Sequence, residues 1–360
     1  MEPTITILND DDDLTFRIDN TNVSIVNAIR RILLSDINTV VIKTFPHEEC
    51  LCNIINNTSR FTNEMIKHRL SCIPIHLKPD TIDLTKYEIR CSKVNNTDTI
   101  IYITTEDLEV YNIDTQEKMD SSQIFPPDPI TNQYIDLLRL KPQLNENIPG
   151  ESIEFICTMT IGNASENSSF NVVSKSTYKN TLDANAADIA WSKHKSTIKS
   201  KENMEFIQKN WYLLEAKRYF IENSFDFKIK TIGIWTNQEL IKLACDVMHK
   251  KLENLKNILE NGTIQINESQ STISNCYDII LMNENYTLGK CLEYILHTNY
   301  YQKKILSYIG YIKEHPHDNH SILRLAFREN DEEIKVKLYE CLMETISTLI
   351  KIFLTIKNKF

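Results

Sequence analysis

Two long amphipathic segments constrain the fold of this chain more than any other feature of its 360 residues. One follows Thr236-Asn237-Gln238-Glu239, a sequence typical of a capping box, and runs to Gly262. The other begins near residue 331. Their apolar stripes have helical spacing and consist of Leu240, Leu243, Ala244, Val247, Leu252, Leu255 and Leu259 in the first, and of Ile334, Leu338, Leu342, Ile346, Leu349 and Phe353 in the second. Each helix must therefore bury its stripe against another element.

A similar order of elements precedes both helices. LTFRIDN and VVIKTF are predicted as strands around a helix, and FDFKIKTIGIW alternates like a strand before the first long helix. YDIILMN, a helix capped by Thr287, and the strands SYIGYIKE and SILRLAFRE come before the second. We therefore expect an internal repeat. The predicted fold is α+β, with two units of a small antiparallel sheet plus long helices that pack as a pseudo-two-fold heterodimer within one chain. Two unrelated α+β domains with a common element order are the alternative.

The pattern also predicts the domain limits. A larger dimerisation domain is expected over 1–79 and 223–262, interrupted by an insert domain over 80–222. The insert is expected to be mainly β, from runs such as IIYIT and IEFICTMTI, with one helix over MEFIQKNWYLLEAKRYFIEN. Residues 263–276 are polar and predicted as a linker, and 277–360 as a smaller dimerisation domain.

Composition excludes several function classes. The net charge of -9 argues against a protein that wraps nucleic acid, since phosphate binding needs concentrated Lys and Arg. The one basic run, KHKSTIKSK at 193–201, is more simply a solvated face. No apolar stretch has membrane-spanning length, and the N-terminus is acidic where a signal peptide is basic. We expect a soluble, intracellular protein without membrane contact.

The sequence has no recognisable catalytic or metal-binding motif. Of nine cysteines only Cys50 and Cys52 form a tight pair, and a zinc site needs a second pair at proper spacing. The six glycines form no phosphate-binding loop. His315 and His317 flank a proline and are expected to orient a loop. We therefore predict a binding protein with no catalytic residues, no metal and no cofactor.

The helix VNAIRRILLSDI carries an adjacent arginine pair. On a helical wheel its core-facing arc holds Ile25, Val26, Ala28, Ile29, Ile32 and Leu33, and the opposite arc holds Asn27, Arg30, Arg31 and Leu34. Two guanidinium groups beside a leucine suit a protein interface, because they bind carboxylates bidentately while the leucine buries apolar area. A solvated polar face is the alternative.

Two segments carry a family resemblance. NVSIVNAIRRILL and FTNEMIKHRLSCIPIHL resemble the α-like assembly subunits of multisubunit RNA polymerases, in which a helix ending in N-x-L-R-R precedes E-F-I-x-H-R-L-x-x-I-P-L. The matching residues are Asn27–Arg31 and Glu64–Ile75. FDFKIKTIGIW and its helix resemble the larger subunit's closing strand and dimerisation helix. Asn285–Lys290 and Tyr308–Pro316 resemble the H-T-L-G-N and G-Y-x-x-x-H-P motifs of the smaller partner. A fused chain of this kind resembles those that large DNA viruses encode.

The resemblance implies a non-catalytic platform of a DNA-directed RNA polymerase. Its partners would be the second-largest, the largest and the small subunits, with DNA and RNA bound only through the complex. A viral chain would be in the host cytoplasm and the virion, a cellular one in the nucleus. Many family members hold a metal in the insert through clustered cysteines, which this chain lacks. A stand-alone interaction or nucleic-acid-binding scaffold is the alternative.

The resemblance also assigns residues. Docking residues would be Asn27, Arg30, Arg31, Leu34, Glu64, His68 and Arg69. Dimerisation residues would be Leu240, Leu243, Val247, Leu252, Leu288, Gly289, Leu292, Leu338, Leu342, Ile346, Leu349 and Phe353. We expect replacement of Arg30 and Arg31 by alanine to leave the chain folded and to weaken capture of the second-largest subunit.

Overall fold

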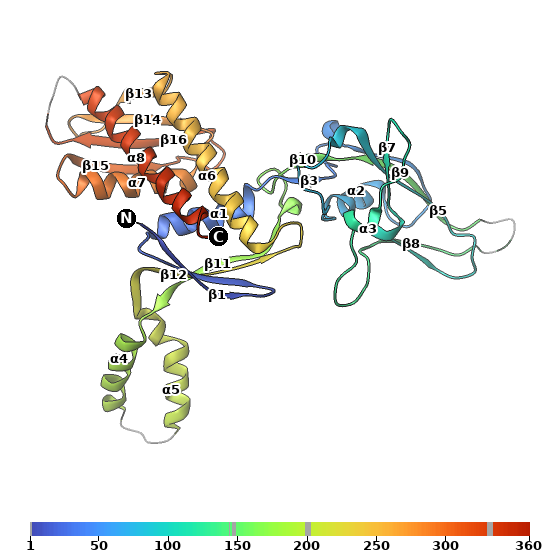
Figure 1. Ribbon diagram of the computed structural model, residues 1–360, viewed down its shortest axis with the longest axis horizontal. Helices are drawn as coiled ribbons and strands as arrows, with labels where there is room; N and C mark the ends of the chain where they lie inside the picture. Colours follow the sequence, from blue (N-terminus) through green and yellow to red (C-terminus); the bar gives the residue numbers. More distant parts are fainter. Residues whose placement is uncertain (1, 144, 146–148, 199–202, 330–333) are drawn as a thin grey trace. The chain divides into compact units, whose positions relative to one another are not determined.

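The computed structural model describes residues 2–143, 145, 149–198, 203–329 and 334–360 (Figure 1). Contacts within the chain divide it into two compact units. Unit 1 comprises Met1–Leu33, Lys175–Lys230 and Asn237–Phe360, and unit 2 comprises Leu34–Ser174 and Thr231–Thr236.

The first half of unit 1 is an antiparallel sheet with two helices. In chain order it contains β1 (Thr4–Asp10), β2 (Leu14–Asp19), α1 (Val23–Ser35), β11 (Val173–Leu182), β12 (Phe220–Thr231) and α6 (Asn237–Glu260). The strand order is β1-β2-β12-β11. Alternation places Leu14, Phe16 and Ile18 on the buried face. Phe16 lies opposite Phe227 in the strand register, and their rings stack with centroids 5.2 Å apart.

The second half repeats this topology. It contains β13 (Gln265–Glu268), β14 (Cys276–Met282), α7 (Tyr286–Leu296), a π-helical turn (His297–Tyr301), β15 (Leu306–Ile312), β16 (His320–Phe327) and α8 (Ile334–Lys357). Its strand order, β13-β14-β16-β15, matches that of the first half position by position. Even a cross-strand ion pair recurs with exchanged signs: Arg17 faces Asp226 between β2 and β12, and Asp278 faces Arg324 between β14 and β16.

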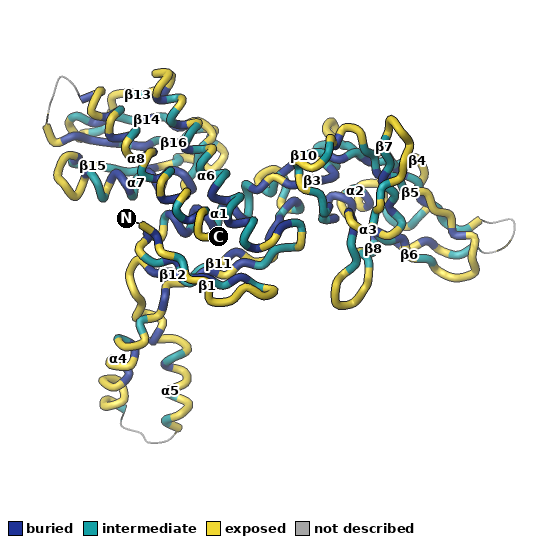
Figure 2. Tube along the Cα trace, in the orientation of Figure 1, coloured by how far each residue is buried: buried dark blue, intermediate teal, exposed yellow. Residues whose placement is uncertain are grey.

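The long helices α6 and α8 pack against each other and join the halves (Figure 1). Figure 2 shows a buried stripe along each helix. On α8 the buried residues include all five that the sequence assigns to dimerisation, namely Leu338, Leu342, Ile346, Leu349 and Phe353. On α6 the stripe is rotated from the expected one: Leu240 and Leu252 are buried, Leu243 and Val247 are only half-buried, and Ile241, Cys245 and Met248 take the central places. In the ranges that the structure describes, no helix is long and apolar enough to cross a membrane.

Unit 2 is mainly β. Its strands are β3 (Thr39–Val41), β4 (Cys52–Asn57), β5 (Tyr87–Val94), β6 (Ile101–Thr104), β7 (Glu109–Asn112), β8 (Asp136–Leu140), β9 (Ser152–Thr158) and β10 (Thr160–Gly162). They form a sheet of order β4-β9-β5-β7 and the pairs β6-β8 and β10-β3. The helices are α2 (Asn63–Ser71) and α3 (Ser121–Ile124), with 3₁₀ turns at His47–Glu49, Leu84–Lys86, Thr105–Asp107 and Ser168–Phe170. The core beneath them is apolar and includes Ile89, Phe155 and Cys157.

A helical hairpin separates β11 from β12 within unit 1. It consists of α4 (Ala184–Thr197) and α5 (Met204–Leu213), followed by a 3₁₀ turn at Glu215–Arg218. Trp191 and Trp211 close its small core, with ring centroids 5.5 Å apart. The basic run at 193–201 begins on α4, and its last residues lie outside the described ranges.

The observed boundaries differ from the expected ones in three places. Unit 2 starts at Leu34 and ends at Ser174, whereas the insert was predicted over 80–222. The predicted helix over 204–223 ends at Leu213, because its apolar tail belongs to β12. The expected linker contains β13, which pairs with β14. In the last two cases a polar or mixed segment takes its structure from a partner strand that local sequence does not reveal.

Phe353 tests the α6–α8 interface. It is fully buried, while its neighbour Leu354 is 38% exposed. Truncation of Phe353 leaves a cavity, so we expect Phe353→Ala to lower the free energy of unfolding by about 3–5 kcal/mol and Leu354→Ala by less than about 1 kcal/mol. Urea denaturation of both variants measures this. Equal effects of the two variants would contradict the packing described here.

The cysteines provide a second test. All nine are free thiols; Cys72 is exposed, Cys50 is half-buried and the others are buried. Burial raises the pKa of Cys91, Cys245 and Cys291 to about 12, so at pH 8 only about one in ten thousand of these groups is a thiolate. With Ellman's reagent at pH 8 we expect Cys72 to react first and the buried thiols only after unfolding. Cys72→Ser should remove the fast phase, and a fast phase that persists would contradict the assignment.

Candidate docking surface

The helix α1 has a buried face and a polar face, as its sequence pattern predicts. The side chain of Asn22 accepts a hydrogen bond from the Ser24 backbone at 2.9 Å where the helix begins. The residues of the core-facing arc are all buried: Ile25, Val26, Ala28, Ile29, Ile32 and Leu33. Asn27, Arg30, Arg31 and Leu34 are half-buried, so other elements cover part of this face.

Arg30 is held by its own helix. Its Nε donates to Asn27 Oδ1 at 3.0 Å, and its carbonyl oxygen accepts a bond from the Ser176 hydroxyl of β11 at 3.3 Å. The side-chain bond to Asn27 fixes the guanidinium plane and leaves its other N–H groups available to a partner. Arg30 and Asn27 therefore present an oriented donor group on the surface of unit 1.

Arg31 makes a contact that the sequence does not predict. Its Nε donates to Thr287 Oγ1 at 2.8 Å, and Thr287 is a buried residue in the first turn of α7. One turn further on, the Cys291 thiol donates to the Ser24 carbonyl at 3.6 Å. Arg31 thus ties α1 to the second half of unit 1. The helical wheel misses this because it considers only the core of the first half.

The contacts around α7 show what three residues of the segment Asn285–Lys290 do. Asn285, rather than Thr287, caps α7 by accepting a bond from the Thr287 backbone at 2.8 Å. The threonine hydroxyl is thereby left to accept from Arg31. Gly289 makes room for Tyr311, since a Cβ at this position would lie 2.2 Å from the tyrosine ring. Asn285, Thr287 and Gly289 therefore each help α7 to begin where it does and to pack against α1 and β15.

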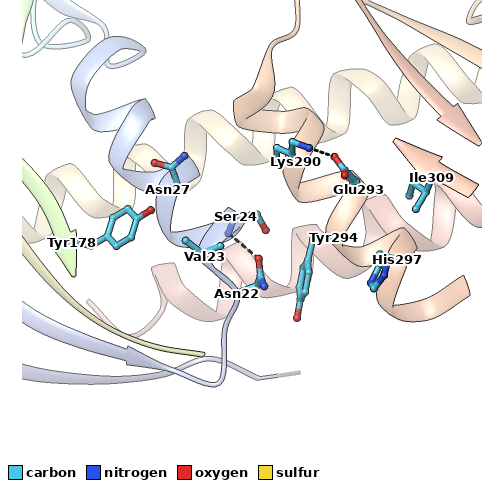
Figure 3. A pocket seen from close by; sticks show the side chains of 10 residues that line it. All are labelled: Asn22, Val23, Ser24, Asn27, Tyr178, Lys290, Glu293, Tyr294, His297 and Ile309. Carbon is cyan, nitrogen blue, oxygen red and sulfur yellow. Dashed lines mark hydrogen bonds and ion pairs between the residues drawn. The ribbon is translucent and has the colours of Figure 1, made fainter. Parts of the chain in front are cut away.

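A cavity of about 390 Å³ opens beside α1 (Figure 3). Asn27 of α1 and Tyr178 of β11 line one side, and Tyr294 and His297 line the side of α7 and its π-helical turn. Burial raises the pKa of the Tyr294 hydroxyl. Its lining combines polar side chains such as Asn27 with the aromatic rings of Tyr178 and Tyr294.

The second group of expected docking residues lies on α2 in unit 2. Thr62 caps this helix by accepting a bond from the Met65 backbone, and hydrogen bonds from the Glu64 backbone and the Thr62 side chain lower the pKa of the Glu64 carboxyl. The Glu64 carboxylate therefore stabilises the N-terminal turn of α2. His68 and Arg69 lie in the last turn, and both are exposed.

The expected docking residues are divided between the two units. Asn27, Arg30 and Arg31 lie in unit 1, whereas Leu34, Glu64, His68 and Arg69 lie in unit 2. The expected dimerisation residues all lie in unit 1, on α6, α7 and α8. Sequence reasoning missed Ser176 and Tyr178, which follow the insert and carry no motif of their own. Among the described residues, His, Cys, Asp and Glu side chains form no group of three that could hold a metal.

The Arg31–Thr287 bond yields a further prediction. A hydrogen bond to a charged donor contributes about 1.5–3 kcal/mol, so Thr287→Val should lower the free energy of unfolding by about 1–2 kcal/mol. In a double-mutant cycle with Arg31→Ala we expect a coupling energy of about 1 kcal/mol, measured by urea denaturation. Arg30→Ala with Thr287→Val is the matched control and should be additive within about 0.5 kcal/mol. Additivity in both cycles would exclude the contact.

The sequence of this chain is similar to those of known proteins. The family described as RNA polymerase Rpb3/Rpb11 dimerisation domain matches residues 15–252. The Rpo3 subunit of DNA-directed RNA polymerase from Methanosphaera stadtmanae is 22% identical over 69% of this chain and 96% of its own length.

Two further relatives are similar. A conjugation stage-specific protein of Tetrahymena thermophila is 23% identical over 69% of this chain and 93% of its own length. The rpac1 subunit of DNA-directed RNA polymerases I and III from Dictyostelium discoideum is 29% identical over 36% of this chain and 40% of its own length. Because the family match covers well over half of the residues, from β2 to α6, the chain belongs to the RNA polymerase Rpb3/Rpb11 dimerisation domain family.

Proposed function

We propose that this chain is a non-catalytic assembly subunit of a DNA-directed RNA polymerase. Two relatives are named as subunits of DNA-directed RNA polymerases. One is aligned with 69% of this chain and the other with 36% of it. The guanidinium groups of Arg30 on α1 and Arg69 on α2 are oriented donors that a partner can meet. A platform that binds other subunits fits these properties, since it needs geometry and complementarity but no reacting group.

We further propose that two α-like subunits are fused in the chain. The repeated strand order, together with the packing of α6 on α8, is the observation that supports this most strongly. In this proposal the first half of unit 1 corresponds to the larger subunit, with unit 2 as its insert, and residues 277–360 correspond to the smaller one. Fusion keeps one half at high effective concentration for the other and fixes their ratio.

The proposed docking surfaces are the exposed parts of α1 and α2. On α1, Asn27 and Arg30 would meet the second-largest subunit, after which the largest and the small subunits join. On α2, His68 and Arg69 are the exposed candidates. Arg31 is left out of the docking set because Thr287 engages it. DNA and RNA would be reached only through the assembled complex.

The proposed fusion of two subunits also suggests which kind of organism encodes the chain. Because single chains of this kind resemble those of large DNA viruses, we propose a viral polymerase that works in the host cytoplasm and is packaged in the virion. Detection of the chain in purified virions by mass spectrometry would test this proposal, and its confinement to a cell nucleus would contradict it.

Arg30 provides the test of the docking surface. We expect Arg30→Glu to reduce co-purification of the second-largest subunit with the tagged chain about 10-fold, because like charges at a docking contact repel. Arg218→Glu is the matched control, since Arg218 lies in the same unit with a side chain that is 77% exposed, away from α1. Quantitative mass spectrometry of the co-purified proteins measures both. Equal recovery with the two variants would rule out the α1 surface.

A further inference from the structure

A groove on unit 2 gathers basic side chains in an acidic protein. Its volume is about 490 Å³, and it lies between the segment that precedes α2 and the strand β8. Four cationic residues line it: Arg60, Arg69, Arg139 and Lys141. Unit 2 has 20 acidic and 11 basic residues, yet the groove itself contains a single carboxylate, Asp136. Basic side chains therefore predominate in this groove, whereas acidic ones predominate in unit 2 as a whole.

Aromatic rings fix two of the guanidinium groups. Arg69 lies over the ring of Phe61 at 5.5 Å and donates to the Asp136 carbonyl at 2.6 Å. Arg139 lies over the ring of Tyr102 at 4.6 Å. A guanidinium held on an aromatic face loses little further conformational entropy on binding and keeps donors in its plane. Both groups are thus prepared to bind a carboxylate.

Part of the positive charge has no internal partner. Asp136 and Glu151 lie 3.7 Å from Arg139 and Lys141 respectively. Among the described residues, by contrast, no carboxylate forms an ion pair with Arg60 or Arg69. Arg60 is also exposed to solvent. An occupant that brings carboxylates would supply the missing partners.

The groove also has apolar area. Ile100 lines it with 55% of its surface exposed, and Leu137 and Leu138 lie buried below. A guanidinium group covers one face of the Phe61 ring and one face of the Tyr102 ring, which reduces the aromatic area available to stacked bases. The chemistry favours a polypeptide with alternating acidic and apolar side chains over a nucleic acid.

We propose that this groove docks an acidic and apolar peptide segment of a partner protein. Carboxylates of the segment bind Arg60, Arg69 and Arg139, and an apolar side chain covers Ile100. That the segment belongs to another polymerase subunit rests on the proposed function. The groove extends the docking surface of α2 beyond the residues that the family resemblance names.

A binding assay tests the chemistry. The probes are a labelled ten-residue peptide of alternating Glu and Leu, its Lys and Leu counterpart, and a ten-nucleotide single-stranded RNA, each titrated with the full chain by fluorescence anisotropy. We expect the Glu peptide to bind and the two other probes to bind at least 10-fold more weakly. Tighter binding of the RNA or of the Lys peptide would overturn the proposal.

Variants locate the binding in the groove. Arg60→Glu should raise the Kd of the Glu peptide about 10-fold, and Arg60→Lys should raise it only 2- to 3-fold, because charge is kept while the bidentate fork is lost. Lys86→Glu is the matched control; its side chain is 54% exposed in unit 2, outside the groove. An unchanged Kd for Arg60→Glu, or an equal loss for Lys86→Glu, would contradict the assignment.

A crosslink identifies the partner and separates the two proposals. A photoreactive residue in place of Ile100, in the tagged full chain in cells, should crosslink to a partner peptide with carboxylates near the linked position. Crosslinks confined to basic segments or RNA would refute the groove proposal. If polymerase subunits co-purify but Arg60→Glu has no effect, only the groove proposal fails. If the Arg60→Glu effect holds but no polymerase subunit co-purifies, only the proposed function fails.

Discussion

The packing of α6 against α8 is the interaction on which unit 1 depends. Each half offers one four-stranded sheet and two helices, and each long helix carries a stripe of buried side chains. When the stripes meet, side chains such as Met248 and Phe353 are withdrawn fully from water. Burial of side chains of this size contributes about 1.5–3 kcal/mol each, which is large compared with the net stability of a domain.

Polar contacts orient this apolar joint. Lys357 of α8 pairs with Asp246 of α6 at 2.6 Å, and Arg31 of α1 bonds Thr287 of α7 at 2.8 Å. The Lys357–Asp246 pair is partly exposed and contributes little stability, but it is satisfied in only one alignment of the two helices. The terminal ring of Phe360 packs edge-on against Phe16, so the end of the chain contacts the sheet of the first half. Apolar area thus holds the halves together, and directional bonds select their register.

Sequence patterns predicted the long, strongly periodic elements well. The helices α6, α7 and α8 and the strands β2, β14 and β16 appear where alternation or helical spacing indicates them, because a whole buried face repeats in the sequence. Short elements such as β13 were missed, since QINE has no apolar face and takes its strand form from pairing with β14.

The expected site was only partly predictable for a related reason. A helical wheel separates the core of α1 from its other face but cannot say what covers that face. Arg30 and Arg31 are neighbours in sequence, and only the tertiary structure shows that Arg31 is engaged by Thr287 while Arg30 is held by its own helix. Likewise, the basic groove on unit 2 joins residues from 60 to 141, and no local motif connects them.

We propose that one chain supplies both α-like halves of a polymerase. Affinity purification of the tagged full-length chain, followed by quantitative mass spectrometry of the assembled complex, tests this most directly. We expect one copy of this chain per complex, together with the two large polymerase subunits and no separate smaller α-like partner. A complex that contains such a separate partner, or that lacks the large subunits altogether, would contradict it.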